Sequence, residues 1–383
     1  MHSVTFYPVG NGDTSLIETE HNKFILMDFY QASGATDSST PVYDIDKALR
    51  AKLKESNKSS FDVVAFTHAD RDHINGSTEF FYLEHAKKYQ GEDRIVIDEL
   101  WVPAAMLLER VKIEERSSEF AIWKKECIHR LKNKSGIKVF SMPDDLVKLI
   151  ESWDMTVNEL SGHIIEAGTI LPNFNLDSDG LEFFVHSPFM KHCDDSNGDI
   201  KKVRNEASLI FNVRFKAGAN NFDYLAIGDS EAQVLEDIVS ITKFYKNEDR
   251  LKWDLFNIPH HCSYLALAED GEKGKDETIP KDKVKELLQM GQPDCYMVCS
   301  SEAFKSGHEA EDSIQPPHIQ ARRCYEKYLG QVKGRKFIVT GEHGGKKKPE
   351  PVVVEITSSG LTIKSLVASA AIATAAATPA RAG

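Results

Sequence analysis

Hydrophobic residues in the first half of the chain fall mainly into short runs that stop at turn residues. Apolar runs of this length, bounded by Gly, Asn, Asp or Pro, are typical of buried strands. We therefore expect strands over 4–10, 14–19, 23–30, 61–67, 97–105 and 137–142. Apolar positions at helical spacing predict helices over 44–56, from Asn75 through 79–89, over most of 106–135 and around 144–153.

The second half continues the same alternation of short apolar runs and helical patterns. Strands are expected over 181–189, 208–215, 222–230, 253–263, 294–301, 336–342 and 352–366. Helices are expected over 231–245 and 316–329, and the charged residues 269–283 predict a surface loop. Strands and helices alternate without a repeat of fixed period, which predicts a layered α/β sandwich with helices outside two sheets.

One polar loop directly follows a predicted buried strand. Residues 62–77 read DVVAFTHADRDHINGS, so His68, Asp70, Asp72 and His73 fall within six positions. A turn or a helix cap explains a single acid after a strand, but it does not explain two acids and two imidazoles together. Carboxylate and imidazole are ligands for divalent cations, so this loop predicts a metal site.

Other acids and imidazoles also stand at predicted strand ends. Asp28 follows one strand, Asp229 follows another, and His260 and His261 follow a third. Taken singly, each has an ordinary explanation as a turn, cap or surface residue. If the strand ends meet at one edge of the sandwich, the side chains form a dinuclear site in which one carboxylate bridges two ions about 4 Å apart.

The loop and several later segments carry a family resemblance. The loop resembles the HxHxDH motif of the metallo-β-lactamase fold, with Asp70 in place of the middle histidine. Five further segments are similar to motifs of one branch of that fold. In chain order they are VGNGDTSLIE, RNEASLIF, LAIGDSE, NIPHHCS and VCSSEAFKSGHEAEDSIQPPHI. This branch contains the nuclease-type domain of the DNA-uptake protein ComEC and its soluble relatives.

The resemblance spans about residues 4 to 358 and implies a fold. The expected fold class is α/β, a four-layer αββα sandwich. It implies a single domain over 1–360 with a helical insertion at about 83–175. The Ala-rich residues 361–383 are expected to form a loosely ordered tail.

The resemblance also implies metal ligands and a nucleophile. His68 and Asp70 would hold one ion, while Asp72 and His73 would hold the other, with Asp72 near the attacking water. The remaining implied ligands are Asp229 as the bridge and His261 in the second site, with His260 as the less favoured choice.

Further residues are implied to support the site or to transfer a proton. Asp28 would support the ligand loop from behind, and Asn205 falls where other members of the fold carry another histidine ligand. His308 or His318 would donate a proton to the leaving group.

Two departures from the family pattern bear on the metal. Asp70 and Asn205 replace histidines, which makes the first site richer in oxygen and shifts its preference from Zn²⁺ toward Mn²⁺ or Mg²⁺. We expect two divalent ions, Mn²⁺ or Zn²⁺, with Mg²⁺ also suited. Cys262 replaces a glycine and is expected to be an inert core residue rather than a neighbour or soft ligand of the metal.

A basic stretch lies within the segment 83–175. We expect it either to follow a phosphate backbone or to be a solvated helix face. The candidate substrate-binding residues are Lys124, Lys125, Arg130 and Lys132.

Composition limits the function classes and the cell compartment that we expect. The net charge of −12 argues against a general nucleic-acid coat protein, but not against a nuclease with a local basic groove. Six cysteines without a CxxC pair, and no signal peptide, predict reduced thiols in a cytoplasmic protein. No apolar stretch is strong enough to predict a membrane span.

The resulting prediction is a metal-dependent hydrolase, a phosphodiesterase or nuclease acting on DNA. A protein partner encoded nearby, as in anti-phage defence, is a further hypothesis, and the oligomeric state is left open. One alternative keeps the site but changes the substrate to a small phosphodiester, ester or lactone. The other is a binding module whose site has decayed, with Asn205 and Cys262 as its signs.

Overall fold

Two β-sheets form the centre of the protein. The computed structural model describes residues 1–37, 39–112, 118–193 and 200–364. The nine strands of the first sheet run in the order β15 (Gly360–Ile363), β14 (Val352–Thr357), β1 (His2–Phe6), β2 (Ser15–Glu18), β3 (Phe24–Met27), β4 (Ser60–Ala65), β5 (Val96–Pro103), β6 (Ile137–Phe140) and β7 (Ile164–Ile165). The six strands of the second sheet run in the order β13 (Lys336–Val339), β12 (Gly291–Cys299), β11 (Trp253–Ile258), β10 (Asn220–Ile227), β9 (Ile210–Ala217) and β8 (Leu181–Ser187).

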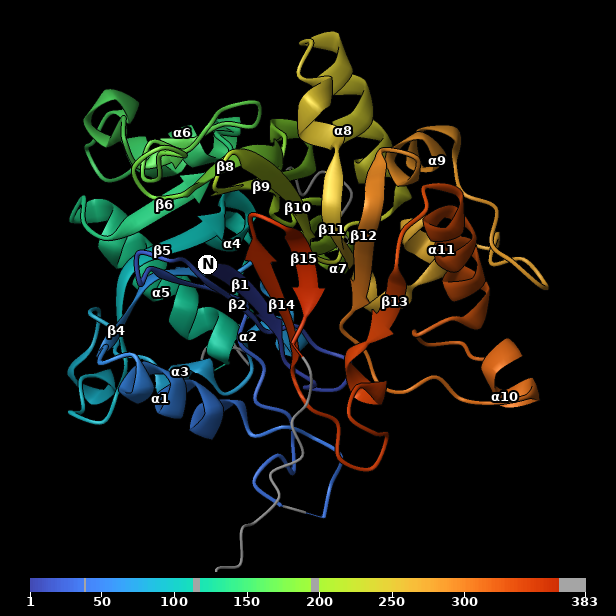
Figure 1. Ribbon diagram of the computed structural model, residues 1–383. Helices are drawn as coiled ribbons and strands as arrows, with labels where there is room; N and C mark the ends of the chain where they lie inside the picture. Colours follow the sequence, from blue (N-terminus) through green and yellow to red (C-terminus); the bar gives the residue numbers. More distant parts are fainter. Residues whose placement is uncertain (38, 113–117, 194–199, 365–383) are drawn as a thin grey trace, which may run out of the picture.

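Each sheet changes from antiparallel to parallel pairing at one strand. In the first sheet β1, β2 and β3 pair antiparallel, whereas β3 through β7 are parallel. In the second sheet β8, β9 and β10 pair antiparallel, whereas β10 through β13 are parallel. Figure 1 shows the red β14 and β15 beside the blue β1, so the late part of the described chain completes the sheet that the first residues begin. Parallel strands bring their carboxyl ends to one edge of each sheet, and this positions the site.

A buried apolar layer joins the two sheets. Trp101 of β5 is fully buried, and its ring centroid lies 5.1 Å from that of Phe183 and 5.7 Å from that of Phe211 in the opposite sheet. The pair with Phe183 is edge-to-face, and such packing of large aromatic rings adds to the free energy gained from burial. The apolar inner faces predicted from the sequence therefore meet as the core of a sandwich.

Helices cover both outer faces of the sandwich. Those packed on the first sheet are α1 (Ile45–Glu55), α5 (Glu119–Lys132) and α6 (Asp144–Glu151). Those packed on the second sheet are α8 (Ala232–Phe244), α9 (Asp282–Leu288) and α11 (Ile319–Gln331). The shorter helices are α2 (Arg71–Ile74), α3 (Ser77–Phe80), α4 (Ala104–Leu108), α7 (Ile200–Glu206) and α10 (His308–Glu311). The predicted four-layer α/β sandwich is confirmed.

One predicted helix is wrong. The helix expected through 79–89 ends at Phe80, where α3 stops. Beyond it, the backbone N–H of Tyr82 donates to the Ile95 carbonyl. The N–H groups of Glu84 and His85 donate to the buried carboxylate of Glu126. These tertiary partners satisfy the backbone of this stretch, and helical structure returns only as a short 3-10 turn over Lys87–Tyr89.

The segment 83–175 contributes both strands and helices. It contains β5, β6 and β7 of the first sheet, together with α4, α5 and α6. The expected helical insertion is therefore in part an extension of the sheet. Of the tail expected over 361–383, residues 361–363 belong to β15, and residues 365–383 lie outside the described part of the chain.

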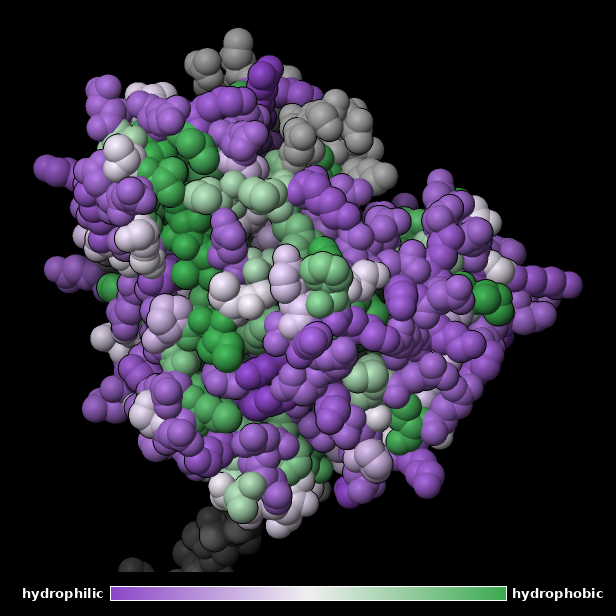
Figure 2. All heavy atoms as spheres, turned by 90° about the horizontal axis from the view of Figure 1, so that it is seen from above, coloured by the Kyte–Doolittle hydropathy of each residue, from purple (hydrophilic) through white to green (hydrophobic). Residues whose placement is uncertain are grey.

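The surface carries few large apolar side chains. Figure 2 shows hydrophilic residues over most of the face seen from above, with hydrophobic residues gathered in a band on its left half. Phe244 and Tyr245, at the end of α8, are among the large apolar residues that are exposed. Within the described ranges, no helix combines the length and the hydrophobicity needed to cross a bilayer.

A buried histidine on the outer face of the second sheet makes stability depend on pH. His186 lies in β8, and its ring nitrogens contact Thr242 Oγ1 at 3.1 Å and the Arg250 carbonyl at 2.9 Å. Burial lowers its pKa from 6.5 to about 4. The unfolded chain therefore takes up a proton near pH 6.5, which the folded protein does not, and the free energy of unfolding falls as pH falls.

We expect wild-type protein to lose about 2 kcal/mol more unfolding free energy than His186→Gln between pH 7 and pH 5. Urea unfolding of both proteins at the two pH values measures this difference. Equal losses in the two proteins would show that His186 does not cause the pH dependence.

Candidate metal centre

The ends of parallel strands bring distant segments together at one edge of the sandwich. Asp28 follows β3, and residues 68–73 follow β4, its parallel neighbour. Asp229 follows β10, and His261 follows β11, which are parallel neighbours in the other sheet. The loop between β1 and β2 adds Asp13. Side chains from both sheets therefore meet at this edge, as the sequence predicted for most of them.

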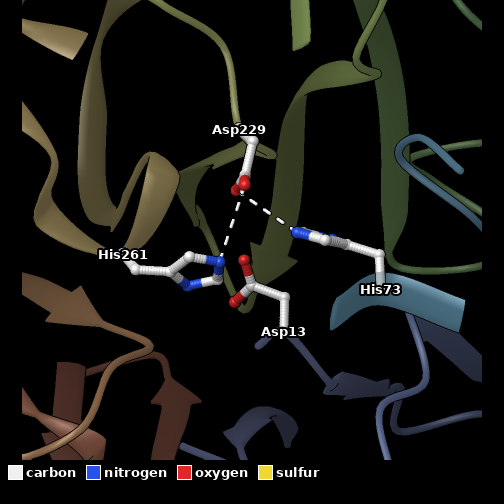
Figure 3. A group of neighbouring side chains, drawn as sticks. All are labelled: Asp13, His73, Asp229 and His261. Carbon is white, nitrogen blue, oxygen red and sulfur yellow. Dashed lines mark ion pairs between the residues drawn. The ribbon is translucent and has the colours of Figure 1, made fainter. Parts of the chain in front are cut away.

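Four of these side chains form a compact group, drawn in Figure 3. One ligand atom each from Asp13, His73, Asp229 and His261 lies within 4.8 Å of all the others. His73 Nε2 is 3.3 Å from Asp229 Oδ1, and His261 Nε2 is 3.5 Å from Asp229 Oδ2. Asp72 lies beside the group, with its Oδ2 3.4 Å from His261 Nε2. This set contains the carboxylates and imidazoles that a divalent cation requires.

His68 and Asp70 extend this group. His68 Nε2 is 4.0 Å from Asp229 Oδ2 and 3.8 Å from Asp70 Oδ2, and the His68 ring centroid lies 4.0 Å from that of His73. Asp229 is therefore approached by three imidazoles, as expected for a carboxylate that could bridge two cations.

Unpartnered polar atoms test whether these residues suit a cation. Within the described ranges, Nε2 of His68, His73 and His261 and Oδ1 of Asp229 are buried and have no hydrogen-bond partner. Buried polar atoms are nearly always hydrogen-bonded, so three orphaned imidazole nitrogens around one carboxylate need another partner. The donor set and its unmet bonding capacity fit a divalent cation.

Contacts to Nδ1 hold the imidazole rings of His73 and His261 in place. His73 Nδ1 lies 2.7 Å from Asp28 Oδ2, and Asp28 itself accepts hydrogen bonds from the backbone N–H and hydroxyl of Thr67. His261 Nδ1 lies 2.8 Å from the Ser300 carbonyl. A proton on each Nδ1 leaves the Nε2 lone pair directed into the site, which is the arrangement of metal-binding histidines.

The site favours positive charge. Burial disfavours protonation of His261, but Asp229 and Asp72 outweigh burial and raise its pKa to about 10. Burial likewise opposes protonation of His73, yet Asp229 and Asp28 hold its pKa well above the ordinary value. Burial raises the pKa of Asp13 to about 6, against the opposing effect of the imidazoles. The cluster therefore stabilises positive charge, either as protons or as a bound cation.

The turn that carries His261 is strained. His260, His261 and Cys262 have φ angles of 50°, 50° and 66°, in the left-handed region that favours glycine. Cys262 occupies the position at which the resembled motif has glycine, and its side chain is fully buried in the apolar core. This location agrees with the expectation of an inert core thiol. His260 lies at the edge of the site, with its Nε2 4.0 Å from Asp229 Oδ2.

An arginine that the sequence interpretation missed holds Asp70. Arg204 of α7 donates from Nη1 to Asp70 Oδ1 at 2.6 Å and from Nε to Glu109 at 2.6 Å. Its guanidinium also lies over the Phe120 ring, 5.0 Å from the centroid. One oxygen of Asp70 is thus engaged by Arg204, and the other faces His68. The neighbouring Asn205 is buried, and its Oδ1 has no partner within the described ranges.

The two predicted proton donors lie outside this group. The His308 side chain is 98% exposed and pairs with Glu311 on α10. His318 is buried, its Nδ1 accepts from the Tyr264 N–H, and its Nε2 contacts the Ile314 carbonyl. Both ring nitrogens of His318 are therefore engaged by backbone groups, and the proton-donor role expected for His308 or His318 stays a prediction.

The residues of the predicted basic face lie in different surroundings. Arg130 is 1% exposed and forms an ion pair with the buried Glu126 at 2.8 Å. Lys124 is half-buried and donates to the Glu109 carbonyl. Lys125 and Lys132 are exposed, and the Lys132 amine lies over the Trp153 ring. Arg130 is therefore not on an exposed basic face, and the substrate-binding role expected for these residues stays a prediction.

Asp13 and Arg204 are the functional candidates that the sequence interpretation missed. Both lie in segments that carry the resemblance, GNGD and RNEAS, but the only site residue taken from these segments was Asn205. The signal for Asp13 was an acid directly after Asn11 and Gly12, in a loop that a turn alone explained equally well.

Neither a protein-family model nor a curated protein matches the sequence. Solved structures match over most of the chain at low identity. An isothiocyanate hydrolase from gut bacteria of Delia radicum shares 10% identity, with 92% of this chain and 98% of that chain covered and a TM-score of 0.37. A metallo-β-lactamase from Elizabethkingia meningoseptica shares 11% identity, with coverages of 86% and 89% and a TM-score of 0.31. The long form of RNase Z from yeast shares 11% identity, with coverages of 88% and 40% and a TM-score of 0.32. Likenesses this distant do not indicate an activity.

Proposed function

We propose that this chain is a metal-dependent hydrolase that cleaves phosphodiester bonds, with DNA as its substrate. The observation that carries the proposal is the convergence of three buried, unpartnered imidazole nitrogens on Asp229. A decayed binding module would not be expected to keep these nitrogens aligned and their Nδ1 atoms anchored.

The residues divide between two cation positions on either side of Asp229. His68 and Asp70 would hold one ion, and His73, His261 and Asp72 would hold the other. When bound, a pair of divalent cations supplies Lewis acidity, which activates water as a nucleophile and neutralises charge on a phosphate.

The protein groups orient the ligands and accept a proton. Asp28 and the Ser300 carbonyl fix the His73 and His261 rings, so the ligand geometry does not have to form during the reaction. The Asp72 side chain is 36% exposed at the edge of the site, which leaves its carboxylate accessible to accept a proton from attacking water. Arg204, beside Asp70, adds a positive charge at the rim.

Two considerations support DNA as the substrate. The ordered motifs resemble a branch of the metallo-β-lactamase fold that includes a nuclease-type domain. A phosphodiester also matches the chemistry of a paired-cation site, because its oxygens carry negative charge.

One observation favours a smaller phosphodiester as a second candidate. A cavity of about 330 Å³ lies beside the ligand loop, with Arg71, Asn75 and Arg204 among its lining residues. This volume suits a small molecule, and Arg71 suits an anionic group, whereas Arg204 is already paired with Asp70 and Glu109.

Cleavage assays with both substrates test the proposal. Linear and circular DNA, and bis(p-nitrophenyl) phosphate as a small phosphodiester, are incubated with protein in Mn²⁺, Mg²⁺, Zn²⁺ or EDTA. We expect DNA cleavage that requires metal and is lost in Asp72→Ala. Asp254→Asn, at a carboxylate of β11 that accepts from the Asp223 N–H, is the control that keeps activity. Cleavage of the small ester alone would move the assignment to the second candidate. No cleavage of either substrate by metal-loaded protein would contradict the phosphodiesterase assignment.

A further inference from the structure

The loop between β1 and β2 carries a carboxylate that the implied ligand set does not include. We propose that Asp13 is a direct ligand of the cation held by His73, Asp229 and His261. This inference rests on the metal dependence of the proposed function, but not on the identity of the substrate. In Figure 3 the Asp13 carboxylate points toward the side chains of Asp229 and His261, from the side opposite the Asp229 backbone.

The loop places Asp13 by contacts with its neighbours. The Asp13 N–H donates to the carbonyl of Asp72 at 3.1 Å, which ties this loop to the main ligand loop. Gly12 is confined, because a Cβ there would lie 2.2 Å from the Tyr30 ring and 2.8 Å from the Asp72 carbonyl. Asn11 donates to a carbonyl and accepts from the Glu302 N–H, both at 3.0 Å. Asp13 is thus anchored through the backbone, and its carboxylate is left for the site.

Charge balance indicates what the carboxylate binds. Asp13 is 8% exposed and Asp229 is 3% exposed, and their ligand atoms lie within 4.8 Å of each other. In the part of the chain that the structure describes, neither carboxylate forms an ion pair with a Lys or Arg side chain. Two buried carboxylates side by side need positive charge close to them, which the neighbouring imidazoles or a bound cation can supply. The unpartnered Nε2 atoms of His73 and His261 lie beside these carboxylates, so a cation among the four side chains satisfies the carboxylates and the imidazoles together.

Asp13 changes the chemistry of this cation position. With Asp13, the position has carboxylates from Asp13, Asp72 and Asp229 and imidazoles from His73 and His261. A third carboxylate makes the position harder and favours Mn²⁺ or Mg²⁺ over Zn²⁺. On the other side of Asp229, one oxygen of the ligand carboxylate is already held by an arginine. We therefore infer that Mn²⁺ fills the position containing Asp13 first.

Titration with Mn²⁺ alone, followed by calorimetry, tests the inference without any substrate. We expect Asp13→Asn to weaken the tighter Mn²⁺ site by about tenfold or more. Asp254→Asn is the matched control, because Asp254 is a largely buried carboxylate of β11 that accepts from the Asp223 N–H, away from the ligand group. The control should bind Mn²⁺ like the wild type. Equal Mn²⁺ affinity in wild type and Asp13→Asn would overturn the inference.

Thermal unfolding separates a ligand from a structural carboxylate. In EDTA, Asp13→Asn should unfold at the same or a higher temperature than wild type, because a repulsive carboxylate is removed. On addition of Mn²⁺, its unfolding temperature should rise less than that of wild type. A variant that is less stable in EDTA but keeps the full rise with Mn²⁺ would show a structural role instead. Wild-type protein that binds neither Mn²⁺ nor Zn²⁺ would overturn the metal-dependent function itself.

Discussion

Asp229→Asn is expected to lower phosphodiester cleavage by about 10³-fold, equivalent to roughly 4 kcal/mol of transition-state stabilisation. Asp229 is the carboxylate that three imidazoles approach, with His68 at 4.0 Å, His73 at 3.3 Å and His261 at 3.5 Å. The amide keeps the size of the side chain but loses the negative charge that two cations would share. Cleavage rates at saturating Mn²⁺, together with metal content after dialysis, measure both effects.

The outcome distinguishes a bridging carboxylate from a supporting one. Asp254→Asn again serves as the control and should retain wild-type rate and metal content. Full metal content with a reduced rate would assign Asp229 to water activation rather than to metal binding. An unchanged rate would contradict the central position given to this residue.

Arg130→Met is expected to lower the free energy of unfolding by about 3–5 kcal/mol. Arg130 Nε donates to Glu126 at 2.8 Å, and Nη1 donates to the carbonyls of Ile97 and Gly136 at 3.1 and 3.0 Å. Methionine fills much of the volume but leaves the Glu126 carboxylate and two carbonyls without this partner. Urea unfolding at neutral pH measures the loss.

Lys132→Met provides the control from the same helix. Lys132 is exposed, and its recorded contact is with the Trp153 ring, so the expected loss is about 1 kcal/mol or less. If the two variants lost equal stability, the internal role given to Arg130 would be wrong. A selective loss of DNA affinity in folded Arg130→Met would restore its predicted role in substrate binding.

The sequence was sufficient for the layers, and for the meeting of most candidate side chains at one edge, because both depend on local patterns. Apolar runs ending in acids and imidazoles gave the strands and their functional ends, including Asp28, His73 and Asp229. The helix expected through 79–89 failed because its backbone partners, Ile95 and Glu126, come from elsewhere in the chain. The spacing of apolar residues within one segment does not indicate such distant partners.

The same limit explains the errors around the site. Arg130 has the sequence context of a solvated basic helix, yet it is buried and donates to the Ile97 carbonyl of β5 as well as to Glu126. Arg204 reaches Asp70 and Glu109 only after three separate segments have packed together. Asp13 lies in a loop whose Asn and Gly residues alone account for a turn. In each case the side chain's role is set by long-range packing.

The division of ligands between the two sheets has a consequence during synthesis. A nascent chain that has completed only the early strands carries His68, Asp70, Asp72 and His73, but neither Asp229 nor His261. Because domains fold as units and the chain emerges from its N-terminus, the complete ligand set assembles only once β10 and β11 have docked. The hydrolytic activity that we propose would therefore appear late in folding, and truncated or half-folded copies would be inactive.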